Sequence, residues 1–207
     1  MPSDPSLCGV LLAGGLARRM GGGDKPLMAL NGRPLLAHAI ARLAPQCAHL
    51  AINANGDPAR FADYGLPVVA DSVEGYAGPL AGVLAGMDYA AAHWPQTRWL
   101  LSAPADTPFP PEDLVMRLKA AMERDNASIA VAASGGRTHH AIALWDISLR
   151  EDLRAALTQE DERKVSAFIA RYAHVVVDWP VAPYDPFFNV NRPEDIPQAA
   201  AIAAQAL

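Results

Sequence analysis

The chain has 207 residues, of which 51% are hydrophobic and 19% charged, and its formal net charge is −5 at pH 7. This balance excludes a disordered chain, and the acidic charge argues against a duplex nucleic-acid binder, which usually presents a basic surface. The sequence has no apolar run of about eighteen residues and no basic, apolar leader. We therefore expect a soluble, cytoplasmic protein that binds neither nucleic acid nor a membrane.

The chain's two cysteines are Cys8 and Cys47, and their spacing fits no disulfide framework, zinc site or redox pair. Cys8 falls in an apolar run that predicts a buried strand, and Cys47 falls between a predicted helix and the next strand. We expect both to be buried, reduced thiols.

Short apolar runs alternate with amphipathic segments along the chain. In chain order, the pattern predicts a strand over 8–12, a helix over 34–43, strands over 50–52 and 67–70, a helix over 80–92, a strand over 99–102, a helix over 111–124, strands over 128–133 and 141–145, helices over 149–157 and 165–172, strands over 174–177 and 188–190, and a helix over 193–206. The helix over 111–124 is the most clearly marked. Pro111 stands at its start, and Glu112 and Asp113 fall in its first turn, where they suit the helix dipole.

Strands that alternate with helices predict an α/β fold, a Rossmann-like three-layer sandwich in which helices cover both faces of a mostly parallel sheet. No repeat or linker divides the chain, so we expect one domain over residues 1–207. Such sheets bind ligands at the carboxyl ends of their strands, near a switch in strand order. A glycine-rich loop, Asn53, Asp71 and Asp106 follow the first four predicted strands, so they should meet at this edge.

The loop after the first predicted strand carries the most information. Five of the ten residues over 14–23 are glycine, and such a loop can turn backbone amides toward one phosphate. Arg18, Arg19 and Lys25 add positive charge beside it. The loop contains neither a Walker A sequence nor the dinucleotide fingerprint. Taken alone, it leaves open a flexible surface loop with solvated charges.

The segment over residues 11–27 resembles the signature of the molybdenum cofactor guanylyltransferase family. Further segments are similar to the family's motifs and occur in the same order, at 71–82, 104–108, 142–145, 163–165 and 188–195. The resemblance covers nearly the whole chain. It implies a fold of the nucleotidyltransferase type, with GTP bound by the N-terminal half and molybdopterin by the C-terminal half.

The reaction that this resemblance implies is the magnesium-dependent transfer of GMP from GTP to the terminal phosphate of molybdopterin, with release of pyrophosphate. A phosphate oxygen attacks the α-phosphorus in line. The protein has only to position two anions and neutralise the charge that develops between them, so no nucleophilic side chain is required. GTP and the molybdopterin cofactor are the expected partners, with molybdoenzymes as recipients and a monomer or weak oligomer as the assembly.

The resemblance also implies roles for particular residues. The implied catalytic residues are Lys25, Asp106 and Arg19. Asp106 is the expected magnesium ligand, and Asn191 is a weaker candidate for a second one. The implied GTP-binding residues are Leu12, Ala13, Gly14, Gly15, Lys25, Asn53, Asp71 and Asp106, with Asp71 accepting hydrogen bonds from the guanine edge. The implied molybdopterin-binding residues are Gly22, Gly78, Gly82, Arg163, Lys164, Asn189 and Asn191.

Each of these side chains also has a structural interpretation. Asn53 fits a turn and Asp106 a turn or helix cap. Gly82 lies in a predicted helix, where it costs about 1 kcal/mol relative to alanine, and close helix packing would explain it. Arg163 and Lys164 fit a solvated start of a helix.

Two positions depart from the family's pattern on the side expected for the pterin. His140 stands where the family tends to have proline, and Arg192 where it tends to have threonine. His139 and His140 are adjacent, and neighbours on a strand point to opposite faces, so they cannot easily share a metal ion. We interpret both as structural or substrate-adjacent.

Two other classes of protein remain open. A cytidylyltransferase, acting on the same cofactor or on another substrate, or a sugar-phosphate nucleotidyltransferase would share the fold. Such families tend to have Leu-Ala-Ala-Gly where this chain has Leu-Ala-Gly-Gly, which favours guanylyl transfer. A carrier that binds nucleotide or finished cofactor without catalysis is the second alternative. The pairing of Lys25 with Asp106 argues against it, because a carrier needs no metal-binding carboxylate.

Overall fold

The structure is a computed structural model that describes residues 4–14, 25–73, 75 and 78–206. Seven strands of this part of the chain form one sheet in the order β5-β4-β1-β6-β8-β7-β9. They are β1 (Leu7–Leu12), β4 (His49–Asn53), β5 (Val68–Val69), β6 (Trp99–Pro104), β7 (Ile129–Ser134), β8 (Arg137–Asp146) and β9 (His174–Trp179). Only β8 runs antiparallel to its neighbours, so the prediction of a mostly parallel sheet is confirmed.

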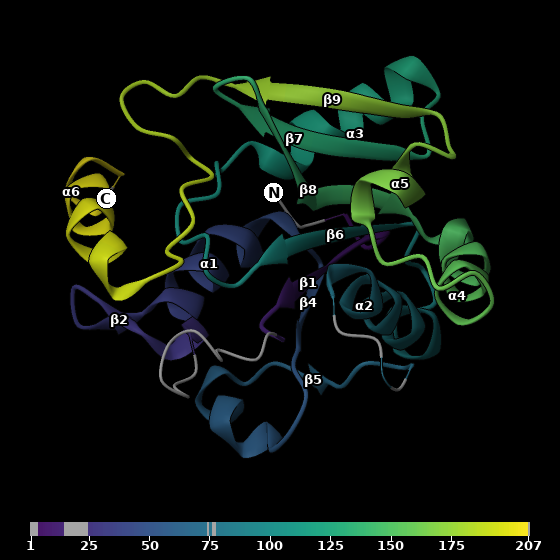
Figure 1. Ribbon diagram of the computed structural model, residues 1–207, viewed down its shortest axis with the longest axis horizontal. Coiled ribbons are helices and arrows are strands. Elements are labelled where there is room, and N and C mark those ends of the chain that lie inside the picture. The colour runs from purple at the N-terminus through teal and green to yellow at the C-terminus, as the bar shows by residue number, and fades with distance from the viewer. Residues whose placement is uncertain (1–3, 15–24, 74, 76–77, 207) are drawn as a thin grey trace.

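Helices cover both faces of this sheet (Figure 1). Side chains alternate along a strand, so Leu7 and Leu11 of β1 pack into one core and Cys8 and Val10 into the other. The first core is closed by α1 (Leu35–Leu43) and α3 (Leu114–Asp125), and the second by α2 (Pro79–His93), α4 (Arg150–Thr158) and α5 (Val165–Ile169). The three-layer arrangement predicted from the sequence is confirmed.

A third, smaller core joins the segment around Leu30 and Leu35 to the C-terminal part of the described chain. The short hairpin of β2 (Ala29–Leu30) and β3 (Arg33–Pro34) lies beside α6 (Ile196–Ala206), as Figure 1 shows. Leu30, Leu35, Val190 and Ile202 are buried together there. This core fixes the segment before α6 next to the residues that follow the glycine-rich loop.

The strand order switches beside β1. The chain runs from β1 outward to β4 and β5, then crosses through α2 to β6 on the other side of β1. At the carboxyl ends, the amide of Ala13 donates to the carbonyl of Asn53 (2.9 Å) and the amide of Ala105 to that of Leu12 (3.1 Å). The three strand ends are thus tied together where a doubly wound sheet binds its ligand.

Helix α3 begins three residues later than predicted, at Leu114. The prediction that Glu112 and Asp113 occupy its first turn is wrong, because both residues precede the helix, with Asp113 at its N-cap. Glu112 pairs with Arg42 (2.7 Å), and Asp113 accepts from the indole of Trp179 (2.9 Å). Both acidic side chains therefore contact residues from other segments of the chain, Arg42 and Trp179.

Other boundaries also differ from the prediction. Residues 188–190 are not a strand, because their amides serve the site and a local turn: Val190 donates to the Asp106 carbonyl and Phe188 to that of Asp185. Helix α5 ends at Ile169 rather than at residue 172. A 3-10 turn over Pro193–Asp195 precedes α6, and β8 starts at Arg137 rather than at residue 141.

Cys8 and Cys47 are both buried and unpaired, as predicted. Burial raises the pKa of the Cys47 thiol to about 12, which keeps it protonated and unreactive. None of the described helices is long and apolar enough to cross a membrane.

Candidate active site

Lys25 and Asp106 form an ion pair at the carboxyl edge of the sheet. Lys25 opens the 3-10 turn Lys25–Leu27, and Asp106 lies in the turn after β6. The Lys25 ammonium also donates to the Oδ1 atoms of Asn191 (2.9 Å) and Asn189 (3.4 Å), and the Asn189 amide donates to Asp106 (2.8 Å). The structure thus brings together four of the predicted site residues from distant parts of the sequence.

The packing of Val190 fixes the segment that carries the two asparagines. The Val190 side chain is fully buried in the third core, and its amide donates to the Asp106 carbonyl (3.0 Å). Asn189 and Asn191, on either side of Val190 in the sequence, turn their side chains toward Lys25 and Asp106.

The chemistry of this cluster fits a magnesium ion. Mg²⁺ prefers oxygen ligands and is usually held by one or two carboxylates together with substrate phosphates and water. Asp106 supplies one carboxylate, and Asn189 and Asn191 supply carboxamide oxygens. The described residues contain no group of three or more His, Cys, Asp or Glu side chains suited to a metal.

A second polar cluster surrounds Asp71, across β1 from the first. The buried Asn53 amide donates to one carboxylate oxygen of Asp71 (2.9 Å) and to the Val69 carbonyl (3.1 Å). Asn55 donates to the other oxygen (2.8 Å) and accepts from the Asp71 amide (2.9 Å). Each carboxylate oxygen keeps further acceptor capacity for a ligand. Sequence analysis missed Asn55, although its spacing of two from Asn53 was a usable signal.

Gly82 packs tightly beside this Asp71 cluster. A Cβ atom there would lie 2.3 Å from Asn53 Oδ1 and 2.7 Å from Leu12 Cδ2, so helix α2 approaches this closely only because residue 82 is glycine. At Gly14 a Cβ would lie 3.4 Å from the same oxygen, an ordinary contact. Gly78 is exposed at the start of α2. Of the other predicted residues, Gly15, Arg19 and Gly22 lie outside the described part of the chain.

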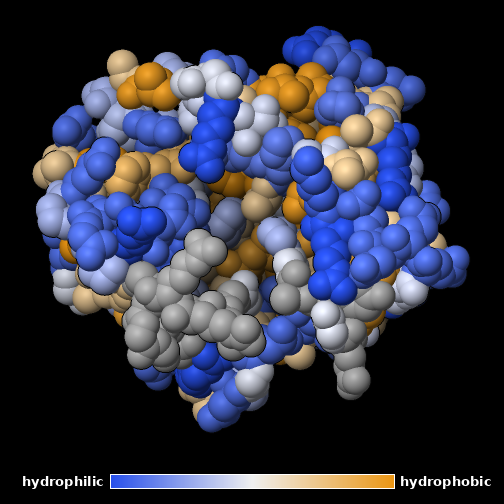
Figure 2. Space-filling model, in the orientation of Figure 1, coloured by the Kyte–Doolittle hydropathy of each residue, from blue (hydrophilic) through white to orange (hydrophobic). Residues whose placement is uncertain are grey.

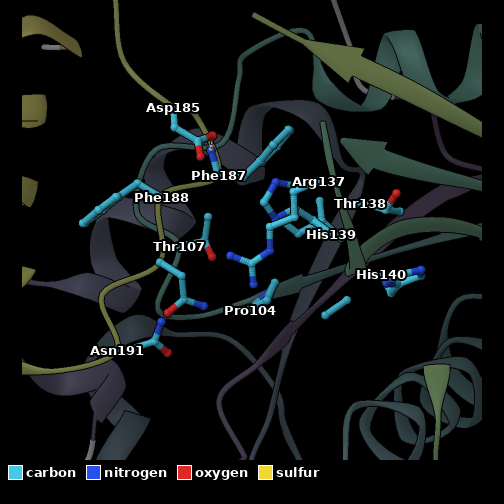
Figure 3. Close-up of a pocket in the computed structure, with 13 residues that line it drawn as sticks. Pro104, Thr107, Arg137, Thr138, His139, His140, Asp185, Phe187, Phe188 and Asn191 are labelled. Carbon is cyan, nitrogen blue, oxygen red and sulfur yellow. Dashed lines mark hydrogen bonds between the residues drawn. The ribbon is translucent and has the colours of Figure 1, made fainter. Parts of the chain in front are cut away.

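A cavity of about 360 Å³ adjoins the Lys25–Asp106 pair and shares Asn189 and Asn191 with it. The molecule is hollowed near the middle of the face seen in Figure 2, with hydrophobic surface inside the hollow. Figure 3 shows side chains from β8 on one side of the cavity and from the segment before α6 on the other. The lining residues are Pro104, Thr107, Arg137, Thr138, His139, His140, Ala141, Ile142, Asp185, Phe187, Phe188, Asn189 and Asn191.

A bulge in β8 brings both adjacent histidines to this cavity. Val131 of β7 pairs with Ala143, but Ala132 pairs with His139, so residues 140–142 are left out of the ladder. A bulge re-aims side chains that a regular strand would alternate. His139 and His140 both line the cavity but have different neighbours: His139 contacts Ser134 and Phe187, whereas His140 lies near His174 and Lys164.

His139 belongs to a hydrogen-bonded network that anchors the cavity wall. The Ser134 hydroxyl donates to Asp185 (2.8 Å) and lies 2.8 Å from His139 Nε2. A hydroxyl has one proton, so His139 must donate from Nε2. Asp185 also accepts from the Phe187 amide (3.0 Å). The network therefore ties the ends of β7 and β8 to the segment that carries Asn189 and Asn191.

Arg163 and Lys164 lie at the exposed start of α5, and neither lines the cavity. Arg163 pairs with Asp161 (2.9 Å). Burial lowers the pKa of His140, and the neighbouring His174 and Lys164 lower it further. Lys164 therefore lies on the His140 side of the cavity.

The two cavity histidines should make stability depend on pH. Burial is the largest cause that lowers the pKa of both His139 and His140 below their ordinary value of 6.5. The unfolded chain then binds more protons near pH 6, so stability is complete above about pH 6.5 and falls as the pH drops through the folded pKa values. We expect the free energy of unfolding, measured with urea, to fall between pH 7.5 and 5.5.

The matched variants for this prediction are the double substitution His139→Gln with His140→Gln, and His93→Gln at an exposed position of α2. The double variant loses the Ser134 contact and so starts from a lower stability, but its stability should change less between the two pH values. The His93→Gln variant should keep the wild-type slope. An equal slope in the double variant would contradict the assignment.

The mostly parallel sheet, with a lysine–carboxylate pair at the switch in its strand order, defines a nucleotidyltransferase of the α/β type. Residues 9–175 match the family described as the MobA-like NTP transferase domain. The chain belongs to this family.

Comparison with known proteins identifies relatives over nearly the full length. The chain is 62% identical over 203 residues to a molybdenum cofactor guanylyltransferase from Rhodopseudomonas palustris (strain BisB5), covering 98% of this chain and 97% of the relative. It is 47% identical to one from Cereibacter sphaeroides, covering 95% and 96%.

Solved structures share the fold at lower identity. Molybdopterin-guanine dinucleotide biosynthesis protein A from Archaeoglobus fulgidus aligns with a TM-score of 0.73 at 20% identity, covering 96% of this chain and 100% of that one. A 4-diphosphocytidyl-2C-methyl-D-erythritol synthase from Anaerococcus prevotii aligns with a TM-score of 0.74 at 15% identity, covering 97% of each. The fold alone therefore does not determine which nucleotide, GTP or CTP, the protein uses.

Proposed function

We propose that this protein transfers GMP from GTP to the molybdenum–molybdopterin cofactor, forming the molybdopterin guanine dinucleotide cofactor and pyrophosphate. The observation that carries the proposal is the cluster of Lys25, Asp106, Asn189 and Asn191, which joins the ligand-binding edge of the sheet to the adjoining cavity. The two substrates thereby meet at one set of charged and amide groups. The names of the full-length relatives support the same reaction.

In this reaction an oxygen of the acceptor's phosphate forms a bond to the α-phosphorus of GTP. The bond from that phosphorus to the oxygen bridging to the β-phosphate breaks, and pyrophosphate leaves. Lys25 offsets the negative charge that develops on the phosphates during the reaction. Its ammonium is held in position beforehand by Asp106, Asn189 and Asn191. Asn189 and Asn191 accept hydrogen bonds from the ammonium and orient it.

Asp106 would hold the magnesium ion, with Asn191 as a candidate second ligand. When bound, Mg²⁺ polarises the phosphate oxygens and adds positive charge beside the leaving group. We assign Leu12, Ala13, Gly14, Asn53 and Asp71 to the nucleoside on the N-terminal side. The C-terminal half, with the cavity, receives the pterin. Oligomeric state, delivery to molybdoenzymes and cytoplasmic location stay predictions.

The function is tested by pyrophosphate release from GTP and, separately, from CTP, with Mg²⁺ and molybdopterin as the acceptor. We expect release with GTP only, and no release when the acceptor is omitted. Release with CTP instead would make the protein a cytidylyltransferase and overturn the assignment of Asp71 to guanine. Tight GTP binding with no release from either nucleotide would favour the carrier.

A further inference from the structure

The cavity beside the Lys25–Asp106 pair contains one permanently charged cation among its lining residues, Arg137. The rest of the lining is apolar or neutral, apart from the carboxylate of Asp185. Asp185 already accepts from the Ser134 hydroxyl and the Phe187 amide. Burial lowers the pKa of both lining histidines, which favours their neutral forms at pH 7. The charge that this cavity offers a ligand therefore comes from Arg137.

The start of β8 positions this arginine. Gly135 and Gly136 form the turn between β7 and β8 with positive φ angles (55° and 75°), and Arg137 pairs with Ser134 to close the hairpin. In Figure 3 the Arg137 side chain extends from β8 into the cavity, and its guanidinium points toward the edge occupied by Pro104, Thr107 and Asn191. That edge is continuous with the cluster that contains Asp106.

Among the described residues, the exposed Arg137 side chain makes no hydrogen bond or ion pair to another side chain. Such an arginine presents a planar fork of donors that matches phosphate oxygens. By contrast, Arg163 pairs with Asp161, and Lys164 lies close to His140. Figure 3 shows His140 on the opposite side of the cavity from Asn191, so Lys164 is near the end remote from Lys25.

We propose that Arg137 binds the phosphomonoester of the acceptor substrate and holds its attacking oxygen beside the Lys25–Asp106 cluster. This inference rests on the proposed function and adds a residue that the sequence did not indicate. In-line transfer brings the acceptor's phosphate close to the triphosphate of GTP. In the proposed reaction Lys25 neutralises charge on the GTP side. A separate cation on the acceptor side offsets the repulsion and fixes the angle of approach.

The neighbouring groups suit the remainder of a flat heterocycle. His139 donates from Nε2 to Ser134, which leaves its Nδ1 as an acceptor in the neutral ring. Phe187 and Phe188 add apolar surface to the same cavity. With Arg137 on the phosphate, the heterocycle would extend toward the histidines and these two rings.

The test compares Arg137→Met and Arg137→Lys with wild type, using molybdopterin and its dephosphorylated form as probes. Pterin fluorescence gives acceptor binding, and pyrophosphate release gives kcat and separate KM values for acceptor and GTP. We expect Arg137→Met to weaken molybdopterin binding and raise its KM by about 10- to 100-fold, with KM for GTP changed less than about twofold. Arg137→Lys should lie between, because it keeps the charge and loses the fork.

Arg124→Met on α3 is the matched control, since this exposed arginine pairs only with the adjacent Asp125 in the contacts described. It should bind both probes like wild type. The dephosphorylated probe should bind equally to wild type and Arg137→Met, which assigns the effect to the phosphate. Melting curves establish that each variant is folded.

Unchanged molybdopterin binding in a folded Arg137→Met variant would overturn the inference, whether or not the wild type turns over. If the wild type releases no pyrophosphate but binds molybdopterin through Arg137, the proposed reaction fails and the phosphate site stands. If wild type and Arg137→Met lose the same affinity when molybdopterin is replaced by its dephosphorylated form, Arg137 does not bind the phosphate.

Discussion

Asp106→Asn should lower the rate of pyrophosphate release by about 10²- to 10³-fold. The substitution keeps the shape of the side chain and can still accept from Asn189, but it removes the carboxylate that Mg²⁺ prefers. It also releases the Lys25 ammonium from its partner. GTP binding without Mg²⁺ should therefore be as tight as in wild type or tighter, while the additional affinity that Mg²⁺ gives should be lost.

Calorimetry of GTP binding with and without Mg²⁺ separates these two effects. Asp125→Asn, at an exposed carboxylate on α3, is the matched control and should leave both rate and affinity unchanged. The metal assignment would be wrong if Asp106→Asn kept more than about a tenth of the rate, or if Mg²⁺ still tightened GTP binding.

Gly82→Ala should damage both stability and GTP binding. The new Cβ would come within 2.3 Å of Asn53 Oδ1, and relief requires Asn53 to move away from Asp71. Overpacking of this kind costs about 1–3 kcal/mol, against about 1 kcal/mol gained from helix propensity. We expect a net loss of stability and about a tenfold weaker affinity for GTP, since a displaced Asn53 leaves Asp71 misplaced.

Gly86→Ala provides a control on the same helix. Its Cβ would meet the Val10 Cβ at 2.8 Å and Leu100 at 3.1 Å, in the core under α2 and away from Asn53. This variant should lose stability in urea unfolding but bind GTP like wild type once folded. Equal losses of GTP affinity in the two variants would show that α2 packing in general, rather than the Asn53–Asp71 contact, governs nucleotide binding.

The sheet could be predicted from sequence because its signals are local. Apolar runs marked the strands, and the polar residues at their carboxyl ends indicated where ligands bind. The paired contacts of Lys25 with Asp106 and of Asn53 with Asp71 join residues at these ends. Predicting that they share one edge required only the rule for parallel sheets.

The remaining errors come from contacts between distant segments. Nothing local reveals that the apolar residues around 188–190 lie in a third core instead of in the sheet. Arg137 also has no motif of its own. The cavity into which it points forms where β8, the end of β6 and the segment before α6 fold against one another.

The Lys25 cluster joins residues that lie far apart along the chain. Asn189 and Asn191 follow Lys25 by 164 and 166 residues, and Val190 between them is fixed by packing against α6 and the β2–β3 hairpin. Contacts of such separation carry a high entropic cost and tend to form late in folding. A nascent or truncated chain that stops before residue 189 could build most of the sheet and still lack this cluster. Proteolysis in the last helix should likewise abolish transfer before it abolishes the fold.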